Sequence, residues 1–178
     1  MRVYTYISAD WDSDKNIVER LRQLNNYYYS PIKFKDVHEI KHAYDSSLNC
    51  SIKKSLGERI ALSKRFVLIV GDKTKDVRAG SCSLCSSYHS WTHTCRRFHN
   101  VDYRSYIDYE CELALDHHLP IIALYNSYKC DTDLLPKPLQ NISGIFHVPF
   151  YTLPYYGAEH FPQVWTENIH ELAQYLCD

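Results

Sequence analysis

One short stretch of the chain is rich in cysteine and histidine, and their spacing could hold a metal. Cys82 and Cys85 are separated by two residues, and Cys95 and His99 follow with spacers of nine and three residues. Three thiolates and one imidazole can close a tetrahedral zinc site, and a closed site has no open position for catalysis. The sequence therefore allows two alternatives: a structural zinc ion that stabilises a segment without its own hydrophobic core, or no metal at all. Two further histidines are rival ligands, His89 and His93.

A second chemical candidate is the carboxylate of Glu110, which follows this cluster. Periodicity predicts a helix from about Tyr103 to His118, on which Glu110 lies about 60° from the buried stripe. A carboxylate at that edge can face a cleft, or it can pair with a neighbouring Lys or Arg. Periodicity alone favours the second alternative. The predicted buried stripe consists of Ile107, Cys111, Ala114 and His118.

The elements that would position these residues alternate between strands and helices along the chain. The continuous apolar run of residues 65–71 is typical of a strand buried on both faces. An alternation of this kind predicts an α/β fold with a parallel sheet flanked by helices. The expected strands are residues 3–8, 31–37, 65–71, 119–126 and 144–150, and the expected helices are residues 15–28, 51–64, 104–118 and 164–178.

A single domain over residues 1–178 accommodates this pattern, with residues 72–103 as a polar, cysteine-containing insertion before the helix of Glu110. Parallel sheets bind ligands beyond the carboxyl ends of their strands. Ser8 and Asp10 lie at the end of the first expected strand, and Asp36 lies at the end of the second. Each is a candidate for binding a ligand, and each could instead be a loop cap.

Composition narrows the choice of partners. The chain has 20 basic and 21 acidic residues, so no basic field indicates nucleic acid or anionic lipid. It shows no export signal and no apolar run of membrane-spanning length. Seven cysteines without such a signal indicate reduced thiols, so we expect a cytoplasmic protein. Dinucleotide-fold, phosphate-loop and serine-hydrolase motifs are missing from the sequence.

The ordered combination of three segments resembles the TIR-like domains, specifically the Thoeris antiphage TIR proteins (ThsB-like). The segments are "VYTYISADWD", "CSIKKSLGERIALSKRFVLIVGDKT" and "RSYIDYECELALDHHLPIIAL", and the resemblance covers roughly residues 2–126. The family's catalytic position follows two aromatic residues, which here are Tyr106 and Tyr109 before Glu110. The family usually has Trp where this chain has Tyr106.

The resemblance implies a flavodoxin-like sheet with helices on both faces, and an enzyme that consumes NAD. Such an enzyme cleaves the nicotinamide–ribose bond and makes an ADP-ribose-derived signal, cyclic or conjugated, which activates a partner effector in antiphage defence. Glu110 would be catalytic, no metal or cofactor would be needed for catalysis, and a homo-oligomer is possible. The residues that would contact the nucleotide are Ser8, Asp10, Phe34, Asp36 and Tyr106.

Two alternatives stay open at this point. The chain could be a TIR-like protein-interaction module without catalysis, or a nucleoside or nucleotide hydrolase on a flavodoxin-like sheet. A scaffold should tolerate Glu110→Gln, whereas an enzyme that uses this carboxylate should not. The sequence does not specify the product, the acceptor or the trigger.

Overall fold

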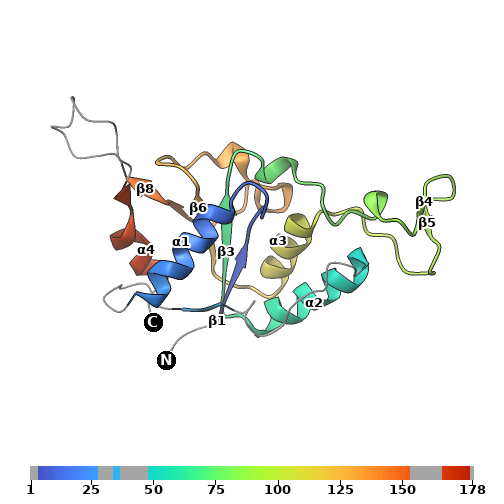
Figure 1. The fold of residues 1–178 in the computed structure, drawn as a ribbon, viewed down its shortest axis with the longest axis horizontal. Coiled ribbons are helices and arrows are strands. Elements are labelled where there is room, and N and C mark those ends of the chain that lie inside the picture. Colours follow the sequence, from blue (N-terminus) through green and yellow to red (C-terminus); the bar gives the residue numbers. More distant parts are fainter. Residues whose placement is uncertain (1–3, 28–33, 37–47, 153–165, 177–178) are drawn as a thin grey trace.

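The centre of the protein is a parallel five-stranded sheet, seen in a computed structural model that describes residues 4–27, 34–36, 48–152 and 166–176 (Figure 1). All four pairings within this sheet are parallel. In spatial order its strands are β2 (Lys35–Asp36), β1 (Tyr4–Ser8), β3 (Arg65–Val70), β6 (Ile121–Tyr125) and β7 (Phe146–Pro149). The predicted α/β class is confirmed, and this order is compatible with a flavodoxin-like fold.

Helices cover both faces of the sheet because successive side chains of each strand point to opposite sides. Helices α1 (Lys15–Asn26) and α4 (Ile169–Leu176) pack on the face that carries Ile7 and Val67. Helices α2 (Asn49–Leu62) and α3 (Tyr106–Asp116) pack on the face of Tyr6 and Phe66. Figure 1 shows the two pairs of helices on opposite sides of β1 and β3.

The observed helices differ in their bounds from the predicted ones, and two of these differences change the role expected of a residue or segment. Helix α3 ends at Asp116, and His118 is exposed with a positive φ of 53°, so its assignment to the buried stripe was wrong. The other three members of that stripe are buried as predicted. The closing helix begins only at Ile169, because Thr166–Glu167 (β9) instead pairs antiparallel with Tyr151–Thr152 (β8).

Residues 78–103, called the arm below, project away from the sheet before α3 (Figure 1). The arm carries a short antiparallel hairpin of β4 (Tyr88–His89) and β5 (Thr94–Cys95). Within residues 82–103, all of which the structure describes, no side chain is buried. The arm therefore has no hydrophobic core of its own. Short 3-10 turns complete the described secondary structure, at Thr74–Asp76, Cys82–Leu84, Thr132–Leu134 and Lys137–Leu139.

Among the described residues, no helix combines the length and the apolar character that crossing a membrane requires.

Candidate active site

The carboxylate of Glu110 is buried at the carboxyl end of β1, with 7% of the residue exposed. Tyr6 donates its hydroxyl to Oε1 at 2.7 Å, and Ser8 donates its hydroxyl to Oε2 at 2.5 Å. Tyr6 and Ser8 are two residues apart on one strand, so both side chains point to the same face of the sheet. This alternation directs two hydroxyl donors of β1 at one carboxylate of α3.

The residue at which α3 begins determines where Glu110 lies along the direction of the strands. Ser105 is the N-cap residue, and its hydroxyl accepts a hydrogen bond from the backbone N–H of Asp108 at 3.0 Å. The same hydroxyl donates to the Asp108 carboxylate at 2.8 Å. A serine followed three residues later by an acidic residue is a signal for a helix start. That signal in the sequence predicts the observed first helical residue, Tyr106, better than periodicity alone.

Four charged side chains connect the base of the arm to α2 and α3. Lys53 of α2 is 5% exposed, and its Nζ donates to the backbone oxygen of Arg104 at 2.7 Å and lies 3.1 Å from the Asp102 carboxylate. Arg104 donates from Nε and Nη2 to Asp102, each at 2.9 Å, and it also pairs with Glu112 of α3. These contacts hold the residues that lead into the helix of Glu110.

The aromatic ring of Tyr6 is locked in the core beneath this site. It is fully buried and stacks on Phe66, with ring centroids 5.6 Å apart and an interplanar angle of 11°. Burial, and then the charge of Glu110, raise the pKa of Tyr6 well above its usual value, whereas the positive charge of Arg59 acts in the opposite direction. The Tyr6 hydroxyl therefore remains protonated and available as a donor at neutral pH.

Arg59 of α2 is a residue that sequence reasoning missed. It is charged, yet only 4% of the residue is exposed, because it lies on a helix face shared with Leu56 and Ile60. In the described part of the chain, its Nε and Nη2 atoms have no hydrogen-bond partner. The available signal was the helical position of Arg59, which periodicity places beside the apolar stripe and not on the solvent side.

Of the five residues predicted to contact a nucleotide, the structure joins Ser8 directly to Glu110. Asp10 instead closes the loop after β1, accepting from the backbone of Asp12 at 3.3 Å and from the Ser13 hydroxyl at 2.5 Å. Phe34 is 1% exposed and belongs to the core on the opposite face of the sheet. The position of Phe34 is thus that of a packing residue.

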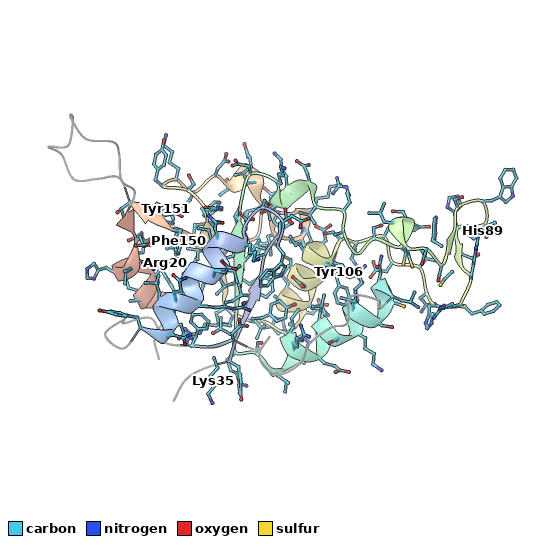
Figure 2. The ribbon with its side chains drawn as sticks, in the orientation of Figure 1. Arg20, Lys35, His89, Tyr106, Phe150 and Tyr151 are labelled. Atoms are coloured by element: carbon cyan, nitrogen blue, oxygen red, sulfur yellow. The ribbon has the colours of Figure 1, made fainter. Side chains whose placement is uncertain are left out.

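The remaining two predicted contact residues also have structural partners. Asp36 is buried at the end of β2, where Arg22 of α1 donates to its Oδ2 from Nε at 2.9 Å and from Nη2 at 2.7 Å. Tyr106 is half-buried at the start of α3, and its hydroxyl donates to the Asn49 side chain at 3.1 Å. Figure 2 shows Tyr106 beside the root of the arm.

A second buried carboxylate lies where the carboxyl ends of β3 and β6 approach α1. Asp14 is 1% exposed, and its Oδ1 accepts from Asn126 at 2.9 Å. Its Oδ2 has no partner within the described residues, and burial raises the pKa of this carboxyl. A Cβ on Gly71 would lie 2.3 Å from Asp14 Oδ1, so only glycine leaves room there. Asp14 is also the N-cap residue of α1, but its side chain makes no capping hydrogen bond.

The predicted zinc ligands are not gathered into one metal-binding group. No group of three or more His, Cys, Asp or Glu side chains suited to a metal occurs among the residues that the structure describes. The Cys82 sulfur instead accepts from the backbone N–H of Asp102 at 3.3 Å. The two alternative histidine ligands, His89 and His93, each form a hydrogen bond between their Nδ1 atom and a hydroxyl group. Zinc in the arm stays a prediction.

Four cysteines stand alone in the sequence, which predicts small buried apolar residues, and their surroundings differ. Cys111 is fully buried in α3, as predicted, and burial raises the pKa of its thiol. Cys50 is half-buried, and Cys130 is exposed, so the prediction of burial was wrong for Cys130. Cys177 lies outside the described residues.

The chain matches no protein-family model, and a search of curated proteins finds no match either. The candidate site therefore rests on its own geometry.

What this geometry can do chemically follows from the charge and the fixed position of Glu110. A hydroxyl of β1 donates to each of its two carboxylate oxygens. The carboxylate is thus held in place, and its negative charge can face a developing positive charge. It can stabilise a cationic reaction centre without a metal ion.

Proposed function

We propose that the protein is a TIR-like enzyme that consumes NAD and cleaves its nicotinamide–ribose bond at Glu110. The observation that carries this proposal is the buried carboxylate at the carboxyl end of β1, held by the hydroxyls of Tyr6 and Ser8. Ligands of parallel α/β sheets bind beyond this edge of the sheet. The resemblance of the sequence around Glu110 to TIR-like domains supplies the substrate class.

The chemistry suits a fixed anion. When the bond between nicotinamide and C1′ of the ribose breaks, its electron pair leaves with neutral nicotinamide, so no general acid is required. Positive charge then develops on the ribose, as in glycoside cleavage, and a preorganised carboxylate stabilises that charge. An acceptor oxygen or nitrogen attacks C1′ and releases its proton, which gives free, cyclic or conjugated ADP-ribose.

In the same proposal, the product is a cytoplasmic signal that activates a partner effector in antiphage defence. The protein would need no cofactor for this reaction, because NAD is its substrate. It could act as a homo-oligomer, and nothing in its charge balance favours nucleic acid as a partner.

The test is replacement of Glu110 by Gln, which keeps the size of the side chain and removes its charge. We expect product formation from NAD to fall at least about 100-fold, because a fixed charge that meets a developing ion contributes several kcal/mol. Mass spectrometry of the small molecules made from NAD measures the loss and identifies the product. Unfolding curves should show that the variant remains folded.

Asp116→Asn is the matched control, because it removes an exposed carboxylate from the last turn of the same helix. Wild-type turnover by the Glu110 variant would refute the catalytic assignment and favour a protein-interaction module. Turnover of free nucleosides in preference to NAD would instead favour the hydrolase alternative.

A further inference from the structure

Arg59 is a buried cation whose best hydrogen-bonding edge is unused. Only 4% of the residue is exposed, and within the described chain Nε and Nη2 have no acceptor. Unpaired buried donors are costly, and those of a charged group are the most costly. An apolar side chain of similar size would avoid this cost at a helix face that already carries Leu56 and Ile60. The guanidinium is therefore expected to serve a partner other than the residues that the structure describes.

The place of Arg59 in the fold relates it to the Glu110 site. Helix α2 precedes β3 and packs against both α3 and β1, so it runs antiparallel to the strands. Long helical side chains lean toward the N-terminus of their helix, which for Arg59 is the direction of the strands' carboxyl ends. Its charge also acts on the hydroxyl of Tyr6, which donates to Glu110. Arg59 thus belongs to the surroundings of the Tyr6–Glu110 pair.

The two unused donors form one side of the guanidinium fork. Arg22 directs the same pair, Nε and Nη2, at one carboxylate oxygen, Asp36 Oδ2, at 2.9 and 2.7 Å. This edge matches two oxygens of a carboxylate or a phosphate, which is why arginine is favoured where such groups are recognised. The vacant fork of Arg59 is therefore suited to an oxyanion.

We infer that Arg59 binds a phosphate oxygen of the substrate's diphosphate while Glu110 faces the nicotinamide ribose. This inference rests on the proposed NAD chemistry, and it extends that chemistry to recognition of the diphosphate. The nicotinamide ribose is joined to the diphosphate by a single methylene group, so one dinucleotide can reach both side chains. The carboxylate of Glu110 then faces the positive charge that develops on the ribose, and the guanidinium of Arg59 faces the negative charge of the diphosphate.

The experiment compares Arg59→Met with Arg20→Met, which removes an arginine whose side chain is 44% exposed and pairs with Glu167. The first readout is the rise in melting temperature that inorganic pyrophosphate causes. The second is KM and kcat for NAD and for nicotinamide riboside, which lacks the diphosphate. A charged hydrogen bond is worth a factor of about 10 to 100 in binding. For Arg59→Met we expect KM for NAD to rise by about that factor and the pyrophosphate effect to vanish.

Nicotinamide riboside separates binding of the diphosphate from general damage to the site. Its kcat/KM should change by less than about twofold in Arg59→Met, because the riboside offers nothing to the guanidinium. Unchanged KM for NAD in a folded Arg59→Met protein would overturn the inference and leave the proposed function standing. Equal losses for NAD and the riboside would also overturn it, since they indicate that Arg59 acts by positioning Glu110.

Two outcomes separate this inference from the proposed function. If the wild type does not cleave NAD but pyrophosphate stabilises it and not Arg59→Met, the oxyanion site stands and the NAD chemistry fails. If Arg59→Met does not fold, the wild type decides the question, because pyrophosphate should inhibit NAD cleavage competitively. Failure of pyrophosphate either to inhibit the wild type or to raise its melting temperature would exclude the site.

Discussion

Replacing Tyr6 by Phe tests whether the hydroxyls of β1 hold the carboxylate of Glu110. The substitution removes one oxygen atom, which donates to Glu110 Oε1 at 2.7 Å, and it keeps the ring that stacks on Phe66. A hydrogen bond to a charged group contributes about 1.5–3 kcal/mol. Because the packing is retained, we expect Tyr6→Phe to lower the free energy of unfolding by about 2 kcal/mol.

Tyr125→Phe provides the control for this measurement. Tyr125 is also fully buried and lies on β6 of the same sheet, and its hydroxyl is 2.8 Å from His147 Nδ1. This contact involves no carboxylate, and a typical hydrogen bond contributes about 1 kcal/mol, so the control should be the milder change. Urea unfolding, fitted with a common dependence on urea concentration, gives both values.

A double-mutant cycle with Glu110→Ala then isolates the contact itself. Once the carboxylate is absent, the Tyr6 hydroxyl is left with one buried acceptor fewer, so its removal should cost at least about 1 kcal/mol less than in the wild type. If Tyr6→Phe costs the same in both backgrounds, the hydroxyl does not hold Glu110, and our account of the site is incorrect.

Two further predictions concern Asp14 and the arm. Asp14→Asn should raise the free energy of unfolding by roughly 1 kcal/mol at about pH 7, because it removes a buried charge with an unpartnered oxygen. Burial raises the pKa of Asp14 in the folded state, so the wild type loses stability as the pH rises through that pKa. Unfolding curves should therefore show a smaller advantage of the variant at about pH 4 than at about pH 7. An equal difference in the free energy of unfolding at both pH values would contradict this reasoning. If the arm binds zinc, metal analysis should find about one equivalent per chain, lost in Cys85→Ser and retained in Cys130→Ser, a replacement of an exposed cysteine. A folded, metal-free wild type purified without chelator would rule zinc out.

The parallel sheet and its helices could be predicted from the sequence because they follow from local periodicity. The buried run of β3 and the apolar stripe of Ile107, Cys111 and Ala114 are examples, since each pattern reports burial within one element. The prediction that His118 is buried was wrong because the helix ends before this residue, and a buried stripe continues only as far as its helix. Periodicity therefore predicts which face of a helix is buried better than it predicts where the helix ends.

The partners of polar side chains could not be predicted in the same way, because they belong to different elements. Asp36 lies at the expected strand end, but only the fold brings Arg22 of α1 to it. Arg59 looks like a surface residue in the sequence, since charged side chains are rarely buried. The sequence indicated Glu110 as a candidate by resemblance, whereas its two hydroxyl donors came from a strand about 100 residues earlier.

The arm enters and leaves the domain at a single point. The backbone N–H of Tyr106 donates to the oxygen of Ala79 at 2.7 Å, and the N–H of Cys82 donates to the oxygen of Asp102 at 2.9 Å. The intervening chain is therefore a closed loop, and the entropy lost on closing such a loop grows only slowly with its length. Insertions or deletions beyond this neck would change the reach of the arm while leaving the start of α3, and with it the position of Glu110, unaltered. The arm is a segment whose length can evolve independently of the chemistry beside it.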